Sequence, residues 1–123
     1  MDSIVLKIPK KIQYISTIRL TTSALVSINQ FNIDEIEDIK VIISEICTFF
    51  INNIENDTDS FEIIYENYDN KVVIKVIDLN EGMLPVDNLK SQMSLLIIDS
   101  LADNYNIDYE NKAITFEKIN NRR

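Results

Sequence analysis

Short stretches of alternating apolar and polar residues predict five β-strands. Residues 3–9 alternate and end at Pro9, which favours a strand at a sheet edge because proline has no N–H for the ladder. Two further runs form a hairpin across the turn at 68–71, and two more form a closing hairpin over Glu110 and Asn111. The predicted strands of these hairpins are 61–65, 72–77, 107–109 and 113–116.

Apolar residues recur at helical spacing in three longer stretches, which predicts three helices. The first covers residues 11–30, and the second has Asp34 as its N-cap and runs to Glu55. The third is capped by Ser91 and follows a loop at 80–88. The apolar positions that define the helices are Ile15, Ile18, Leu25 and Val26 in the first, Ile36, Ile39, Ile43, Ile46 and Phe50 in the second, and Leu95, Leu96, Ile98 and Leu101 in the third.

The order of these elements is β-α-α-β-β-α-β-β. Helices gathered against an antiparallel-rich sheet form a two-layer α+β sandwich, so we expect that fold. A chain of 123 residues has the length of a single domain. We expect this domain to cover residues 1–119, with 120–123 as a frayed tail.

Charge excludes several classes of partner. The formal net charge is −8, from 20 acidic and 12 basic residues. Such a surface repels nucleic-acid phosphates and anionic lipids, so we expect neither nucleic acid nor membrane as a partner. The first residues lack the pattern of a signal peptide, and no apolar run reaches the length of a membrane span. We therefore expect a cytoplasmic protein.

The residue types that are missing exclude several kinds of chemistry. The chain has no histidine, which removes Ser/His and Cys/His catalysis and the commonest metal ligand. It has one cysteine, which excludes an internal disulfide and a multi-cysteine metal site. That residue, Cys47, lies in an apolar helical pattern, where a small buried hydrophobe is expected.

Two segments carry a resemblance to a known family. Residues 34–48 read Asp-Glu-Ile-Glu-Asp-Ile-Lys-Val-Ile-Ile-Ser-Glu-Ile-Cys-Thr, and residues 15–23 read Ile-Ser-Thr-Ile-Arg-Leu-Thr-Thr-Ser. With the element order, they resemble the anti-sigma factor kinases of the RsbW/SpoIIAB type, which share the GHKL fold of ATP-binding proteins. The resemblance is good over the first half of the chain and weak beyond Asp78. It implies a GHKL fold with a shortened lid over the ATP site.

The resemblance implies a general base and a metal ligand on the second helix. Glu45 matches the glutamate that acts as base toward a substrate serine, but Phe49 stands where the family has an asparagine that holds Mg²⁺. Phenylalanine offers no oxygen to a hard cation. Asn52 and Asn53, one turn further along, are the alternative ligands. Helix geometry places Glu45 and Phe49 opposite the apolar seam, and a solvated helix carboxylate is the other interpretation of Glu45.

Two other motifs of the nucleotide site are only partly present. Asp78 matches the aspartate that recognises the adenine amino group, although a strand-end aspartate is also a common turn residue. Asn80 replaces the family's glycine two residues later, unless Gly82 takes that role. Residues 91–99 match the segment that closes over the phosphates but contain no glycine, the residue that allows close backbone approach. We therefore interpret the site as dismantled and expect no cofactor.

What remains of the family's features is a protein-binding surface on the first helix. In the family, an arginine there contacts the sigma factor and its antagonist, a STAS-domain protein, and Arg19 matches it. We expect Ser16, Thr22 and Ser23 on the same surface. An exposed guanidinium suits bidentate capture of a carboxylate, and an ordinary solvated arginine is the alternative. The resemblance also implies a homodimer.

Three functions stay open from the sequence. The favoured one is an anti-sigma-like regulator that binds a sigma factor or its STAS-domain antagonist in a partner-switching circuit of stress response or sporulation. The second is an active serine-protein kinase that uses Mg·ATP with Glu45 as base, although loss of the metal ligand and the phosphate cradle together opposes it. The third is a scaffold or small-ligand module, since a fold does not determine a function.

Overall fold

The structure is a computed structural model that describes residues 1–85 and 92–120. Within these residues, no helix is both long enough and apolar enough to cross a bilayer. The elements are β1 (Asp2–Pro9), the 3-10 helix η1 (Ile12–Tyr14), α1 (Ile15–Val26), α2 (Ile33–Asn53), β2 (Ser60–Asn67), β3 (Lys71–Asp78), α3 (Gln92–Leu101), β4 (Asn104–Asp108) and β5 (Ala113–Ile119).

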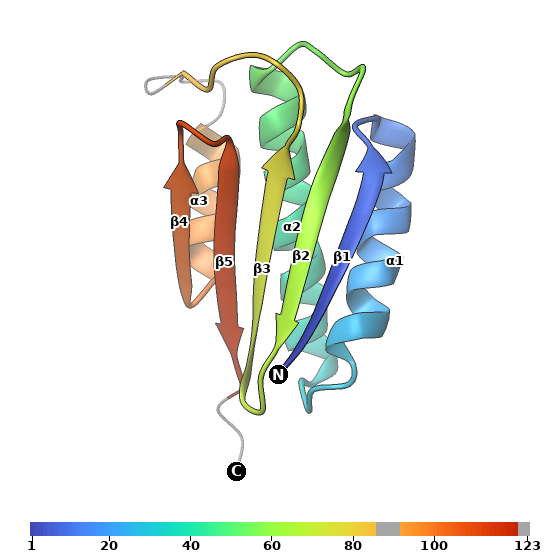
Figure 1. Cartoon of the computed structure of the whole chain (residues 1–123). Helices are drawn as coiled ribbons and strands as arrows, with labels where there is room; N and C mark the ends of the chain where they lie inside the picture. Colours follow the sequence, from blue (N-terminus) through green and yellow to red (C-terminus); the bar gives the residue numbers. More distant parts are fainter. Residues whose placement is uncertain (86–91, 121–123) are drawn as a thin grey trace.

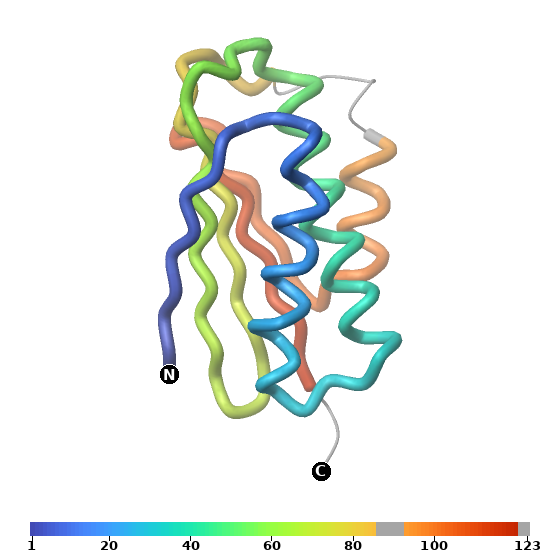
Figure 2. Tube along the Cα trace, turned by 90° about the vertical axis from the view of Figure 1, so that its right-hand side faces the viewer, coloured from blue at the N-terminus to red at the C-terminus, as the bar shows by residue number. Residues whose placement is uncertain are grey.

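The strands form one antiparallel sheet in the order β1-β2-β3-β5-β4, so β1 lies at an edge as predicted. Figure 1 shows the helices behind this sheet, with α2 between α1 and α3. The view in Figure 2 separates strands and helices into two layers. These observations confirm the predicted two-layer α+β sandwich.

The core lies between the two layers. Residues of β2 and β3 are alternately buried and half-buried, because successive side chains of a strand point to opposite faces of the sheet. The predicted seam of α2 faces the same core, with Ile36 half-buried at its start and the later seam residues fully buried. Those fully buried seam residues are Ile39, Ile43, Ile46 and Phe50.

The first helix is shorter than predicted. The chain makes the 3-10 helix before α1, and α1 ends at Val26 rather than near residue 30. Three residues after this point, the Asn29 side chain bonds outside the helix, where its Nδ2 donates to Asn67 Oδ1 at 3.2 Å, at the end of β2. The helical spacing of apolar residues does not reveal this hydrogen bond, so it did not predict where the helix ends.

The N-cap of α2 is Asn32, and the prediction of Asp34 is wrong. Asn32 Oδ1 accepts a hydrogen bond from the Glu35 N–H, and Glu35 Oε1 accepts one from the Asn32 N–H, each at 2.8 Å. This reciprocal pair is a capping box. Asp34 instead lies in the first turn, where its charge favours the positive end of the helix dipole.

The frayed tail does not begin at residue 120 as predicted. Asn120 is buried, and its N–H donates to Asn70 O at 2.7 Å, which ties the end of β5 to the turn between β2 and β3. The other predicted tail residues, 121–123, lie outside the described residues, as does Ser91, the predicted cap of α3.

Asn32→Ala is expected to lower the free energy of unfolding by about 1 kcal/mol, because it removes the side chain that satisfies an N–H of the first turn. Urea denaturation followed by circular dichroism, in about 0.5 M NaCl, measures the loss. Asp34→Ala is the matched control, since salt screens its interaction with the helix dipole. Equal losses for the two variants would contradict Asn32 as the cap.

Candidate functional site

Three connections meet at one end of the molecule, at the top of Figure 1. They are the segment from β1 to η1, the segment from α2 to β2, and the start of the loop after β3. Lys10 lies in the first segment, Ile54 and Asn56 lie in the second, and Asp78 is the last residue of β3. The fold therefore brings residues from three distant parts of the sequence to one place.

The Lys10 ammonium joins these connections. Its Nζ donates to Ile54 O at 2.6 Å, to Asp78 Oδ2 at 2.7 Å and to Asn56 O at 3.0 Å. The side chains of Lys10 and Asp78 are 1% and 0% exposed. Ile54 is the C-cap residue of α2, so the ammonium also lies at the negative end of the helix dipole. Asp78, the predicted adenine-binding residue, is thus paired with a cation of its own chain.

Asn80 binds the other oxygen of Asp78. Its backbone N–H and its Nδ2 both donate to Asp78 Oδ1, at 2.9 and 2.8 Å. The Asn80 side chain also binds the backbone of Asp59. Asn80 Oδ1 accepts from the Asp59 N–H at 2.7 Å, and Asn80 Nδ2 donates to the Asp59 carbonyl at 3.2 Å. The residue that replaces the family's glycine therefore ties the end of β3 to the start of β2.

Gly82 allows the loop after β3 to pass close to the end of α2. Its φ is +139°, and a Cβ at this position would lie 2.9 Å from Ile54 Cγ2. Any other residue would need both an unfavourable backbone conformation and a displaced loop. This steric role explains the glycine, and its predicted part in a cofactor site stays a prediction.

Glu45 faces α3. Ser94 Oγ donates to Glu45 Oε2 at 3.0 Å, and Ser94 is buried. A carboxylate that accepts a hydrogen bond from a serine hydroxyl has the geometry of a general base. Here that hydroxyl belongs to a helix of the same chain, which covers this side of α2.

The position that the resemblance assigns to a metal ligand holds a buried ring. Phe49 is 2% exposed and packs edge-on against Phe50, with ring centroids 5.8 Å apart. Asn53 Nδ2 donates to Phe49 O at 2.7 Å, and Asn52 is exposed. The apolar side chain of Phe49 thus fills part of the space between α2 and the rest of the core.

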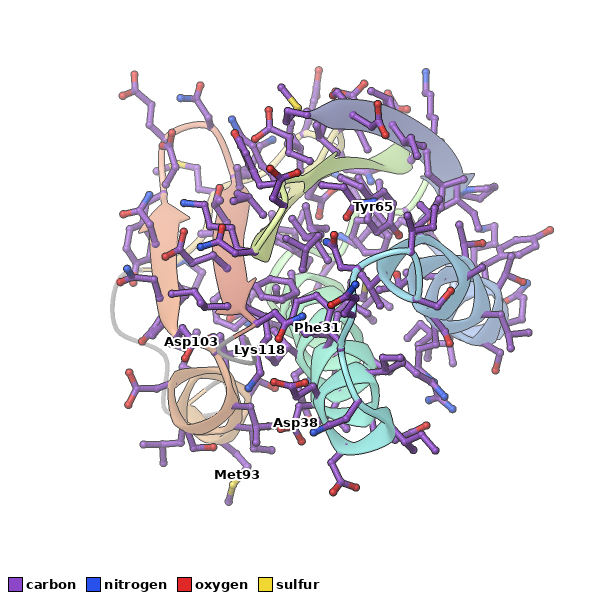
Figure 3. The ribbon with its side chains drawn as sticks, turned by 90° about the horizontal axis from the view of Figure 1, so that it is seen from below. Phe31, Asp38, Tyr65, Met93, Asp103 and Lys118 are labelled. Atoms are coloured by element: carbon purple, nitrogen blue, oxygen red, sulfur yellow. The ribbon has the colours of Figure 1, made fainter. Side chains whose placement is uncertain are left out.

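Thr22 belongs to the interior. It is fully buried, its Oγ1 donates to Ile18 O at 2.7 Å, and this oxygen lies 2.8 Å from Tyr65 OH. Figure 3 shows Tyr65 between the sheet and α1. This burial contradicts the prediction that Thr22 contacts a partner, because its hydroxyl is used to pack α1 on β2.

The outer face of α1 carries the other predicted partner-binding residues. Ser16 and Arg19 are exposed and Ser23 is half-buried, and their spacing of three and four residues puts them on one face. Leu20 lies among them and is 69% exposed, and Ile12 in η1 is 71% exposed. Sequence reasoning missed Leu20, although a leucine outside the apolar seam of its helix was the available signal.

No model of a known protein family matches the chain. The serine-protein kinase RsbW of Bacillus cereus (strain AH820) is 34% identical over 93 residues, which cover 75% of this chain and 58% of the relative. The chain is a homologue of RsbW. The RsbW proteins of Bacillus anthracis and Bacillus thuringiensis (strain Al Hakam) show the same identity and coverage, so the chain spans little more than half the length of these relatives.

A solved structure has the same fold. The crystal structure of the RsbU and RsbW domains of Rv1364c from Mycobacterium tuberculosis aligns with a TM-score of 0.71 and 17% identity, over 95% of this chain and 31% of that chain. At this identity the likeness establishes the fold alone, and it confirms the GHKL expectation. The homology to RsbW confirms the resemblance inferred from residues 15–23 and 34–48.

Lys10 is the site residue that sequence reasoning missed. It follows Pro9 at the end of β1 and precedes another lysine, where a solvated charge is the ordinary expectation. Its partner Asp78 is 68 positions away, so only the fold brings the two together. The sequence contains no local signal for this pair.

Cys47 lies in the core near this site. Burial, with a smaller contribution from the charge of Asp78, raises the pKa of the Cys47 thiol from 9.0 to about 12. Because the thiolate is the nucleophilic form, the folded protein holds this cysteine in its unreactive state.

At pH 8 the native protein is expected to react with Ellman's reagent at least ~100-fold more slowly than the urea-unfolded protein, because the raised pKa keeps the thiol protonated. The raised pKa stabilises the fold below about pH 9, and this contribution is lost as the pH rises toward 12. The free energy of unfolding of Cys47→Ala should therefore fall less steeply with pH above about pH 9 than that of the unaltered protein. Rapid labelling of the native protein would refute this assignment.

Proposed function

We propose that the chain is an anti-sigma-like binding module that acts without ATP. It binds a sigma factor or that factor's STAS-domain antagonist through the outer face of α1, within a partner-switching circuit of stress response or sporulation. The proposal that ATP does not bind rests mainly on Asp78, because its two carboxylate oxygens are hydrogen-bonded to Lys10 and to Asn80. We also infer that it acts in the cytoplasm, as a homodimer like the family it resembles.

Other residues of the nucleotide site support this proposal. Phosphoryl transfer depends on positioning and on neutralising the charge of the phosphates, which in most enzymes needs a bound metal ion. Phe49 is a buried ring where the family has a metal ligand, and the Glu45 carboxylate is bound by Ser94. Each of these features removes one requirement of a kinase, and together they favour a protein-binding function.

The outer face of α1 has the composition of a binding surface. It combines one guanidinium, Arg19, with exposed apolar side chains at Leu20 and Ile12. Arginine is enriched among the few residues that carry most of the binding energy in protein interfaces, whereas leucine is under-represented there, so Arg19 is the expected anchor. Since the chain has a net charge of −8, long-range attraction does not draw in an acidic partner. A carboxylate of the partner is therefore bound by the local geometry of Arg19.

The second candidate is an active serine-protein kinase, the activity for which the Bacillus relatives are named. The contact between Ser94 Oγ and Glu45 Oε2 favours it, because it demonstrates that a serine hydroxyl fits at this carboxylate. For the kinase to work, α3 would have to move aside and a metal ion would have to bind without the asparagine that Phe49 replaces. The binding-module proposal needs neither a movement of α3 nor a bound metal ion.

Titration of the folded protein with ATP and ADP in the presence of Mg²⁺ is expected to release no binding heat at millimolar nucleotide. The reason is that the carboxylate for the adenine amino group is occupied and the metal ligand is lost. Phe49→Asn serves as the comparison, with its fold checked by circular dichroism. Saturable micromolar binding by the unaltered protein would refute the proposal, and binding gained only in Phe49→Asn would mark decay of a former kinase site.

Arg19→Ala is expected to weaken partner binding about 10–100-fold, equal to ~1.4–2.8 kcal/mol, and to leave the thermal stability unchanged. Arg19→Lys should recover only part of this loss, because an ammonium does not form the bidentate pair. Surface plasmon resonance against sigma factors and STAS-domain proteins of the same genome measures both variants. Lys7→Ala, which removes a different exposed cation on β1, is the matched control. Equal effects at Lys7 and Arg19 would exclude the α1 surface.

A further inference from the structure

The surroundings of the Lys10 ammonium have the form of a ligand site. An ammonium has three N–H donors and no acceptor, and the chain supplies three oxygens for it. These are Ile54 O, Asp78 Oδ2 and Asn56 O, at 2.6, 2.7 and 3.0 Å from Nζ. Two of them come from the carbonyl end of α2 and one carries a full negative charge. We propose that these oxygens form a primary-amine subsite and that Lys10 is its internal ligand.

Occupation from within makes Asp78 inaccessible to an external amino group. Its Oδ1 accepts two hydrogen bonds from Asn80, its Oδ2 accepts one from Lys10, and the side chain is 0% exposed, so solvent does not reach the carboxylate. This inference rests on the proposed function, because it gives the physical reason why the chain does not bind an adenine amino group. It adds a ligand class, a primary alkylammonium ion, that the proposed function does not contain.

The subsite has an entrance. A surface pocket of about 330 Å³ lies beside it and is lined by Lys10, Lys11, Ile12, Gln13 and Ile51, among others. Lys10 and Ile54, the donor residue and one of the acceptor residues of the subsite, both line this pocket. Truncating the Lys10 side chain at Cβ therefore opens a path from solvent to a polar, negatively charged cavity.

The chemistry of the opened cavity selects its ligand. A buried carboxylate without a counter-charge is strongly unfavourable even though Asn80 still donates to it, and the two carbonyls would also lose their donor. The atoms removed by Lys10→Ala are three methylene groups and an ammonium, which are the atoms of n-propylammonium. This ion restores the charge, the three donors and the apolar stem together.

The test compares the thermal stability of Lys10→Ala with and without n-propylammonium chloride. The melting temperature of this variant is expected to fall by roughly 10–20 °C and to be raised saturably by millimolar n-propylammonium. The unaltered protein should not respond. Tetramethylammonium chloride, a cation without N–H donors, and 1-propanol, which has no charge, are the matched control ligands and should leave the variant unchanged. Equal shifts with all three additives would overturn the proposal.

A second measurement applies even if Lys10→Ala does not fold. Lys10→Cys is made in a Cys47→Ala background, alkylated in urea with 2-bromoethylamine, which rebuilds an ammonium at the length of lysine, and refolded. Its melting temperature should return to within a few degrees of the Cys47→Ala parent, whereas alkylation with iodoacetamide, which adds a neutral amide, should not restore it. Equal recovery with both reagents, or with neither, would overturn the proposal.

The double variant Lys10→Ala with Asp78→Asn separates the carboxylate from the carbonyls. It is expected to lose the response to n-propylammonium, because the charge that binds the amine is gone. An undiminished response would place the amine elsewhere and overturn the proposal. Failure of the proposed function would appear differently, as nucleotide binding by the unaltered protein.

Discussion

The buried ion pair between Lys10 and Asp78 is the constraint on which one end of the molecule depends. Desolvating two charges is costly, and the Coulomb attraction compensates for it only with close contact and complete hydrogen bonding. Both conditions hold here, because the ammonium has three acceptors within 3.0 Å and the carboxylate also binds Asn80. Since Lys10 follows β1, two acceptors lie in the segment after α2 and the third is at the end of β3, the pair fixes three connections relative to one another.

The internal contacts of this part of the fold use the residues that the resemblance assigns to a nucleotide site. Asn80 replaces a glycine and bonds to Asp59, Phe49 fills core volume, and Glu45 accepts a hydrogen bond from Ser94. Each change removes a feature of an open site and adds a contact within the chain. The outer face of α1 does not take part in these internal contacts. Arg19 and Leu20 are exposed, whereas Thr22, on the buried side of the helix, contacts Tyr65. Stability and proposed binding therefore depend on different residues.

The sequence was sufficient for the elements that follow from periodicity, and insufficient for contacts that depend on their placement. The seam from Ile36 to Phe50 and the order of strands predicted the sandwich, because burial of an apolar stripe is a property of the element itself. The cap at Asn32 was missed although its capping-box spacing was present, since Asp34 offers the same chemistry two residues later. The burial of Thr22 and the Lys10–Asp78 pair depend on tertiary placement, which no local pattern encodes.

A binding module that lacks a nucleotide has a restricted means of release. A ligand shifts an equilibrium only by its differential affinity for the two states, so under the proposed function no bound nucleotide is available to lower the affinity for a partner. Release then requires a competitor for the same face of α1. A competitor at 100 times its dissociation constant shifts the balance by about 2.7 kcal/mol, which raises the apparent dissociation constant of the partner close to a hundredfold. The exposed surface of α1 would thus be shared by two partners in turn, and the concentration of the competitor would take the role that phosphorylation has in a kinase.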